Sequence, residues 1–248
     1  MYVSGLTDVG FVRNQNQDAI FFSSAPIGPL PNLYIVADGM GGHNAGDVAS
    51  NQAIKHFSEY IRNFPAAQFV QSSDYLDLMV NAAQIANVAV FEQAEAVSAM
   101  AGMGTTLTAC VLSEEKAMIV QVGDSRAYAI SPERIEQITT DHTYIQELLQ
   151  AGRISREEAS THPKRHVLTR ALGTQSHLEV DGIVREIGEW EAVLLCSDGL
   201  NNMLDDETIM EIVNREGYVE HRVRALIDRA NEQGGRDNIS VVLIDIKR

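Results

Sequence analysis

Cysteine is scarce in this chain, and its two occurrences exclude several kinds of site. Cys110 and Cys196 both stand inside apolar runs, LTACVL and AVLLCSDG, so we expect two buried free thiols rather than a disulfide. The absence of a CxxC pair argues against zinc or dithiol redox chemistry. Neither cysteine begins a CxxxxxR motif, so a covalent cysteinyl-phosphate mechanism is not expected.

Basic residues are also few. The 248 residues include 19 Lys and Arg against 34 Asp and Glu, which gives a formal net charge of −15. Such a charge repels nucleic acid and anionic lipid. We therefore expect neither nucleic acid nor a membrane as a partner. The surplus of carboxylates either solubilises the surface or converges in part on cations, and composition does not choose between the two.

Long apolar runs are missing as well. No stretch approaches the ~20 apolar residues that span a bilayer, and the opening MYVSGLTDVG lacks the segments of a secretory signal. The hydrophobic fraction of 45% is typical of a globular chain. No repeat and no linker rich in Pro, Gly or Ser divides the sequence. We expect one cytoplasmic, monomeric domain over residues 1–248.

Short apolar runs typical of strands are distributed along the whole chain. They cover residues 19–22, 33–37, 118–122, 192–196 and 239–244. Stretches with helical spacing lie between them in blocks. Because strands and helices do not alternate strictly, we predict an α+β fold, with antiparallel or mixed sheets covered by helices.

Four helices are predicted from this spacing and from cap residues. The first begins at Asn44, carries Ile54, Phe57 and Ile61 on one face, and ends before Pro65. The second begins near Ser73 or Asp74, and its predicted buried face consists of Leu78, Ala82, Ile85 and Ala89. The third and fourth form a pair over about 205–215 and 218–232.

Five aspartates stand at the ends of the predicted strands. Asp38, Asp124 and Asp198 follow strands, whereas Asp18 and Asp237 precede them. In antiparallel pairing the end of one strand lies beside the start of its neighbour, so the five acids are expected to meet at a single edge. The alternative for any one of them is an ordinary cap of a strand or turn.

Glycines near these acids weaken that alternative. They stand at positions 39, 123, 199 and 234–235, where bare backbone lets a ligand approach and lets a carbonyl serve as a donor. Carboxylates ~4 Å apart repel by ~4 kcal/mol at an effective dielectric of 20, so a cluster of them needs protons or cations. Oxygen donors without cysteine or a histidine pair favour Mg²⁺ or Mn²⁺. This pattern indicates a hydrolase with two ions ~3.5–4 Å apart that activate a bridging water.

Six motifs carry most of these residues in a fixed order. They are TDVGFVRNQNQD (7–18), VADGMGGHNAG (36–46), MGTTL (103–107), VGDSRAY (122–128), LLCSDGL (194–200) and GGRDNISVVL (234–243). In order and spacing they resemble the metal-dependent serine/threonine phosphatases of the PP2C type, and in length the bacterial stand-alone branch. This resemblance runs from residue 7 to about 244 and implies a central antiparallel β-sandwich flanked by helices on both faces.

The resemblance also implies the functions of individual residues. Asp38 would bridge two metal ions, and the carbonyl of Gly39 would ligate the second. Asp198 and Asp237 would complete the coordination of the first ion, and Asp18 would hold water bound to a metal. The remaining assignments are Asp124, which with Asp198 would hold a weaker third ion; Arg13, whose forked donors suit a phosphate monoester; and Asn238, which either orients the phosphate or water or is a turn residue before a strand.

Two positions depart from the family pattern. Met40 stands where many members have a histidine that protonates the leaving alcohol, so the general acid is unassigned, with a metal-bound water or His43 as candidates. Gln17 replaces the usual glutamate before Asp18 and should tune metal affinity. Gly39, Gly41 and Gly42 are expected to keep side chains away from the phosphate. A nucleotide-binding loop is excluded, because this run lacks the third glycine of GxGxxG.

Residues 141–173 resemble the flap of bacterial members. Basic residues gather there in an otherwise acidic chain, namely Arg153, Arg156, Lys164, Arg165 and Arg170. They either recognise the phosphoprotein or form a solvated loop. Thr105 and Thr106 likewise have two alternative roles, packing or hydrogen bonding at the site.

The predicted function is hydrolysis of phosphoserine and phosphothreonine in proteins by water activated at two Mn²⁺ or Mg²⁺ ions, with a third ion as an option. The expected partners are therefore phosphorylated substrates of serine/threonine kinases. One alternative is a hydrolase of small phosphoesters. Another is a non-catalytic pseudophosphatase, which Met40 favours and the complete set of aspartates disfavours.

Overall fold

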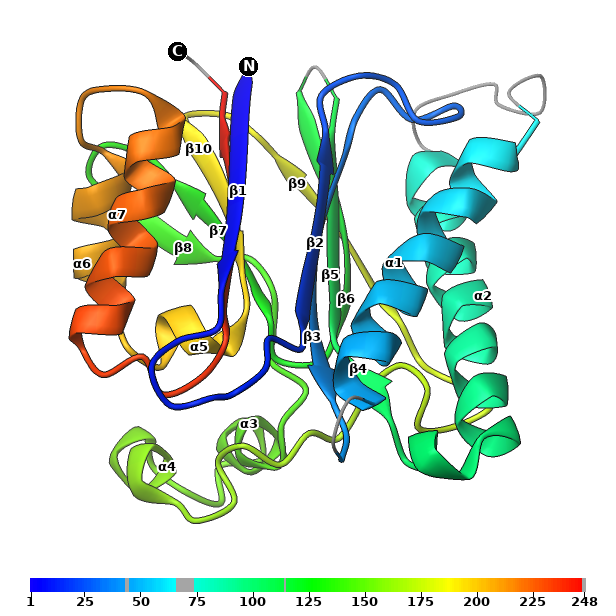
Figure 1. Cartoon of the computed structure of the whole chain (residues 1–248). Helices are drawn as coiled ribbons and strands as arrows, with labels where there is room; N and C mark the ends of the chain where they lie inside the picture. Colours follow the sequence, from blue (N-terminus) through cyan, green and yellow to red (C-terminus); the bar gives the residue numbers. More distant parts are fainter. Residues whose placement is uncertain (43–44, 66–73, 114, 247–248) are drawn as a thin grey trace.

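Two antiparallel sheets packed face to face form the centre of the protein, as the computed structural model shows for residues 1–42, 45–65, 74–113 and 115–246 (Figure 1). In the first sheet the strands follow the order β1 (Tyr2–Asp8), β11 (Ile239–Asp245), β10 (Ala192–Cys196), β7 (Arg126–Ile130) and β8 (Ile135–Gln137). In the second the order is β2 (Asp18–Ser23), β3 (Leu33–Met40), β5 (Leu107–Leu112), β6 (Lys116–Val122) and β9 (Asp181–Glu186), and β4 (Gly104–Thr105) pairs with the end of β3.

The space between the sheets is filled by apolar side chains from both of them. Tyr34 and Val36 of β3 lie in one buried cluster with Val193 and Leu195 of β10 and Val242 of β11. The opposite faces of these strands are covered by helices. Because the central strands are buried on both faces, they consist of unbroken apolar runs rather than alternating ones.

Helices cover both outer faces of this sandwich (Figure 1). One pair packs on the second sheet, namely α1 (Ala45–Asn63) and α2 (Asp74–Ala96), which the short η2 (Ser98–Met100) follows. On the first sheet lie α5 (Asp198–Asn201), α6 (Asp206–Val213) and α7 (Val219–Glu232). Two short helices extend beyond one end of the sheets, α3 (Tyr144–Gln150) and α4 (Arg156–Thr161).

The α+β prediction is confirmed, and each of the predicted strands is present. The predicted pair of C-terminal helices corresponds to α6 and α7, and the side chain of Asp205 caps α6 by accepting from the backbone N–H of Thr208. In the first helix Ile54, Phe57 and Ile61 are buried as expected. The predicted starts at Asn44 and Ser73, and the candidate acid His43, lie outside the described residues.

The predicted buried face of α2 was partly wrong. Ile85 is 46% exposed, and the buried stripe contains Met79, Ala83, Ala86 and Val90 beside the expected Leu78 and Ala82. The reason is that α2 packs against α1 as well as against β6 and β9. Small alanines allow this close approach on two sides, so the buried stripe is shifted and Ile85 is left outside.

Both cysteines are free and buried, as expected. Burial raises the pKa of the Cys196 thiol to about 12, so neither thiol has the character of a nucleophile. No helix in the described parts of the chain is both long and apolar enough to cross a bilayer.

Candidate active site

The five aspartates approach one another at one end of the sandwich. Asp18 begins β2 and faces Asp38 of β3 directly in register. Asp198 begins α5 immediately after β10, Asp237 precedes β11, and Asp124 lies in the turn between β6 and β7. The acids therefore come from both sheets, and the predicted single edge is corrected to the shared end of two packed sheets.

Asp38 is held by its backbone. Its N–H donates to Oγ1 of Thr106 at 2.8 Å, and its carbonyl accepts from the N–H of Thr106 at 2.9 Å and from Oγ1 of Thr105 at 2.9 Å. Both threonines are buried. Their hydroxyls thus fix the end of β3 and leave the carboxylate of Asp38 to face the other acids.

Asp18 is the most buried of the five acids. Oγ of Ser197 donates to its Oδ2 at 2.7 Å, while its Oδ1 has no hydrogen-bond partner among the described residues. Burial raises the pKa of Asp18 from 3.8 to about 7, and the charges of Asp198 and Asp237 add to this effect. A buried carboxylate oxygen without a donor is costly, so this atom suits a bound water or cation.

Three of the other acids are affected in the same way. Burial, followed by the charges of the neighbouring aspartates, raises the pKa of Asp38 well above its ordinary value. For Asp124 burial and the charge of Asp198 raise the pKa to about 8. Burial, followed by the charge of Asp237, raises the pKa of Asp198 too, although its Oδ2 accepts a hydrogen bond from Nδ2 of Asn202 at 3.0 Å. Without a cation, the cluster holds protons at a pH where carboxylates are normally charged.

Gly39 is required by close packing. A Cβ at this position would lie 2.0 Å from the carbonyl oxygen of Gly46, at the start of α1. A Cβ on Gly46 would in turn lie 2.8 Å from the carbonyl oxygen of Gly39. Gly39 is therefore needed for the packing of α1, and its expected role in leaving room for phosphate stays a prediction. At Gly42, by contrast, no described atom lies within 4 Å of a built Cβ. Because Gly46 has no side chain, it does not crowd the carbonyl oxygen of Gly39.

Met40 and Gln17, the two departures from the family pattern, both pack inward. A Cβ on Gly104 would lie 2.8 Å from Cε of Met40, so this side chain covers β4. The side-chain amide of Gln17 lies against Gly46, whose Cβ would approach its Cδ to 2.8 Å.

Arg13 lies beside the acids on the loop between β1 and β2. Its Nη2 donates to Oδ2 of Asp237 at 2.8 Å, and its pKa is raised by this bond and by the charges of Asp38 and Asp198. The side chain is 53% exposed. A half-exposed guanidinium with further free donors is well suited to meet an anion that arrives from solvent.

Asn238 clamps the loop that carries Arg13. Its Oδ1 accepts from the N–H of Gln17 at 2.8 Å, and its Nδ2 donates to the carbonyls of Val9 and Gln15 at 3.0 and 2.9 Å. The amide is buried and both of its amide hydrogens are used. Of the two alternatives for this residue, the geometry favours a structural one over contact with phosphate.

The donor set fits a divalent cation in its chemistry. It consists of carboxylates and a carbonyl, which are the ligands of hard ions, and the orphaned oxygen of Asp18 and the raised pKa values show that positive charge is needed there. Across the described ranges of the chain, no three carboxylate, histidine or cysteine side chains stand ready as ligands of one ion. Binding of an ion would therefore draw the acids closer together.

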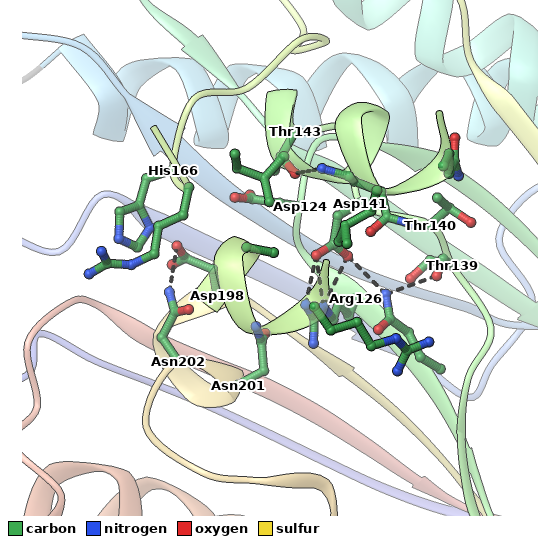
Figure 2. A pocket seen from close by; sticks show the side chains of 18 of the residues that line it. Asp124, Arg126, Thr139, Thr140, Asp141, Thr143, His166, Asp198, Asn201 and Asn202 are labelled. Carbon is green, nitrogen blue, oxygen red and sulfur yellow. Dashed lines mark hydrogen bonds and ion pairs between the residues drawn. The ribbon is translucent and has the colours of Figure 1, made fainter. Parts of the chain in front are cut away.

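A cavity of about 860 Å³ adjoins the acids and extends under residues 141–173 (Figure 2). The residues that line it include the acids Asp124 and Asp198 and the basic residues Arg156, Arg165 and His166. Figure 2 shows His166 beside Asp198.

The basic residues of this segment have different environments. Arg156 and Arg165 line the cavity. By contrast Arg170 is committed to ion pairs with Asp181 at 2.7 Å and Glu179 at 3.1 Å.

Several residues that shape the site were not predicted from the sequence. Ser197 donates to Asp18, and Arg126, which follows Asp124 in the chain, binds Asp141 with Nε and Nη2 at 2.9 and 2.7 Å (Figure 2). His142 contacts the turn before Asp124. The motifs contained Ser197 and Arg126, but their partners lie far away in the sequence.

The chain matches the protein phosphatase 2C family over residues 12–243, and it belongs to this family. The serine/threonine phosphatase stp of Listeria innocua is 36% identical over 246 residues, which cover 99% of this chain and 96% of that protein. The serine/threonine protein phosphatase PstP of Mycobacterium tuberculosis is 38% identical over 240 residues, 97% of this chain and 44% of the longer PstP.

Solved structures agree with this assignment. The serine/threonine phosphatase Stp1 of Staphylococcus aureus superposes with a TM-score of 0.90 at 31% identity and covers 99% of this chain and 95% of its own. The catalytic domain of PstP, solved in complex with two manganese ions, superposes with a TM-score of 0.83 at 34% identity, over 98% of this chain and 97% of its own.

Proposed function

We propose that the protein hydrolyses phosphoserine and phosphothreonine in phosphorylated proteins with the help of two divalent cations, Mn²⁺ or Mg²⁺. The observation that carries this proposal is the gathering of buried aspartates from both sheets, whose pKa values are raised by burial and mutual repulsion. A scaffold without catalytic ions gains nothing from such repulsion. Membership of the protein phosphatase 2C family supports the same function.

The proposed ligands combine membership of the protein phosphatase 2C family with the gathering of the acids. Asp38, Asp198, Asp237 and the carbonyl of Gly39 would hold the two ions. Asp18 would hold water at the site through its Oδ1, and Asp124 with Asp198 would offer a weaker third position. When bound, the two ions activate water and neutralise charge on the phosphoryl group.

The other residues position the substrate. Arg13 retains free guanidinium donors while Nη2 is bound to Asp237, so it binds two phosphate oxygens and turns the ester towards the acids. Thr105 and Thr106 hold Asp38 in place. Met40 has no proton to give, so the leaving alcoholate takes its proton from water in the open cavity.

Residues 1–248 act as a single catalytic domain in this proposal, with residues 141–173 as a flap. The cavity between the flap and the acids is about 860 Å³ and open to solvent, which is enough for a segment of a phosphoprotein. Arg156 and Arg165 on its wall attract the acidic groups of such a segment. A monomeric state stays a prediction.

A comparison of three substrates tests the proposed function. Turnover of a phosphothreonine peptide, a phosphotyrosine peptide and an aryl phosphate is measured with and without Mn²⁺ for the wild type and Asp38→Asn. We expect metal-dependent turnover that is fastest on phosphothreonine and falls at least ~10³-fold in the variant, because ~4 kcal/mol of charge stabilisation is lost.

The matched control is Asp228→Asn, which changes an exposed aspartate on α7 and should leave turnover unchanged. Turnover without any divalent cation would contradict the mechanism. Stoichiometric Mn²⁺ binding without turnover would instead identify a pseudophosphatase, and preference for the aryl phosphate would identify a hydrolase of small esters.

A further inference from the structure

His142 is a buried histidine that has no role in the proposed chemistry. It is only 6% exposed and lies at the base of the flap, two residues before α3. Its ring contacts the turn that presents Asp124, and its other nitrogen contacts Asp181 at the start of β9. The residue thus touches both a predicted metal-binding turn and the first strand after the flap.

His142 forms hydrogen bonds with both backbone polar groups of Gly123. The N–H of Gly123 donates to Nδ1 of His142 at 3.2 Å, and the carbonyl of Gly123 accepts from the backbone N–H of His142 at 2.9 Å. Gly123 has a φ of 97°, and a Cβ there would lie 2.5 Å from Cγ2 of Thr106. The turn therefore depends on outside contacts for its shape, and Asp124 is the next residue.

The hydrogen bond from Gly123 fixes the state of the imidazole. A backbone N–H is only a donor, so Nδ1 has to be the acceptor and the ring is neutral, with its proton on Nε2. Nε2–H then donates to Oδ2 of Asp181, 3.1 Å away. Nη1 of Arg170 lies 3.5 Å from Nε2 but cannot bond to a protonated nitrogen, and it donates to Oδ1 of Asp181 at 2.7 Å instead.

The same residue connects both ends of the flap. The N–H of Thr169 donates to the carbonyl of His142 at 2.9 Å, and Thr143 forms an isolated antiparallel bridge with Leu168. Asp181, which accepts a hydrogen bond from the imidazole, also accepts one from Nη1 of Arg170. The entry and exit of the flap are therefore joined at His142, next to the Asp124 turn.

We propose that His142 is a positioning residue that fixes the Asp124 turn through Nδ1 and joins this turn to the base of the flap through Nε2. The inference rests on the proposed function insofar as Asp124 is assigned there to the weaker third ion. The two ring nitrogens have separable tasks. Nδ1 sets the position of Asp124 and hence the affinity of that ion, while Nε2 restrains the flap.

Two substitutions separate these tasks. In His142→Asn, Oδ1 replaces Nδ1 as the acceptor for Gly123, but the link to Asp181 is lost. In His142→Gln, the side-chain amide reaches Asp181 as Nε2–H did, but the acceptor for Gly123 is lost. Each variant therefore keeps one of the two hydrogen bonds of His142 and loses the other. Both variants lose the packing of the imidazole ring to a similar extent. Asp181→Asn is a third variant that weakens only the flap link.

The first experiment is NMR spectroscopy of the full chain with Mg²⁺ at neutral pH. We expect ring ¹⁵N shifts of a neutral imidazole protonated at Nε2. The Gly123 amide should exchange with solvent at least ~10-fold faster in His142→Gln than in His142→Asn, because only the latter retains an acceptor. A ring protonated at Nδ1, or equal exchange in the two variants, would overturn the proposal.

The second experiment is a calorimetric titration with Mn²⁺. His142→Gln should weaken the lowest-affinity ion by about 10-fold, as changes next to a ligand commonly do, and leave the tighter ions unchanged. His142→Asn and Asp181→Asn should retain that affinity and should instead speed proteolytic cleavage within residues 141–173. Wild-type affinity in His142→Gln would count against the proposal.

The two experiments also separate this proposal from the proposed function. If the wild type binds no Mn²⁺, the metal-dependent mechanism fails, while the tautomer and the exchange of the Gly123 amide still test His142. If Mn²⁺ binds and supports turnover but the two variants behave alike, only the inference about His142 fails.

Discussion

Arg13 and Asp237 are 224 residues apart in the sequence and form an ion pair of 2.8 Å at the candidate site. The Arg13 side chain is 53% exposed, and an exposed pair of this kind adds little to stability. The pair orients the guanidinium towards the acids, where its remaining donors are available for a phosphate.

Arg13 should therefore act on substrate binding. At saturating Mn²⁺, Arg13→Ala should raise KM for an aryl phosphate by about 10- to 100-fold, since ~1.5–3 kcal/mol of charged hydrogen bonding is lost. Arg13→Lys should recover only part of this, because lysine lacks the forked donors. Steady-state kinetics measures both. The control is Arg134→Ala, at an exposed arginine that pairs with Glu136, and an unchanged KM in Arg13→Ala would refute the assignment.

Asn238 should act through Arg13. Its amide holds the backbone at Val9, Gln15 and Gln17, so Asn238→Ala should release the loop and raise KM in the same direction as Arg13→Ala. In a double-mutant cycle the two effects should be less than additive, because both remove the same positioned guanidinium. Full additivity in kcat/KM would show that Asn238 contacts the substrate independently.

The glycines of the DGMGG run should differ sharply in their tolerance. Gly39→Ala places a Cβ 2.0 Å from the Gly46 carbonyl and should lower Tm by about 5 °C or more through overpacking. Gly42→Ala adds a Cβ with nothing within 4 Å and should leave Tm unchanged. Thermal unfolding of the two variants checks this, and equal losses of Tm would mean that packing of α1 is not the reason for Gly39.

Stability of the metal-free protein should fall as the pH rises. The folded-state pKa of Asp18 is about 7, above its ordinary 3.8, so between these values the folded chain holds a proton that the unfolded chain has released. This contribution to stability is complete below about pH 4 and is lost as the pH rises through about 7. Tm of the chelator-treated protein should fall by about 5 °C or more across this range.

Two comparisons isolate the cause of this pH dependence. Asp18→Asn mimics the protonated acid and should flatten the profile. Added Mn²⁺ should raise Tm most at high pH, where protons no longer neutralise the cluster. A metal-free Tm that rises from pH 5 to 8 would show that the acids are not strained in the folded state.

The predictable parts of the fold were those that local chemistry determines. Runs such as AVLLC and ISVVLI are buried on both faces and identified β10 and β11 directly. The half-exposed edge strand β9, DGIVRE, was not predicted, and the largely buried strands β5 and β7 inside the sheets were missed as well. The buried face of α2 was partly misassigned because alanines fit two neighbouring surfaces, and this cannot be derived from spacing alone.

The candidate site was predictable as a set of residue types but not as a geometry. Aspartates at strand ends and the motifs around them indicated a cation site. Which sheet each acid belongs to depends on strand pairing across the chain, such as Asp18 opposite Asp38. The contact between His142 and Gly123 likewise joins the flap segment to one of the motifs, and no local sequence pattern predicts it.

The division of the acids between the two sheets has a consequence for folding. Asp18 and Asp38 arrive with one sheet, and Asp198 and Asp237 arrive with the other. A chain in which only one sheet has formed would carry only part of the proposed ligands and should have little affinity for a pair of ions. In the proposed mechanism, partly folded molecules would therefore lack catalytic competence during synthesis, and tight cation binding would be a late event that requires the completed docking of both sheets.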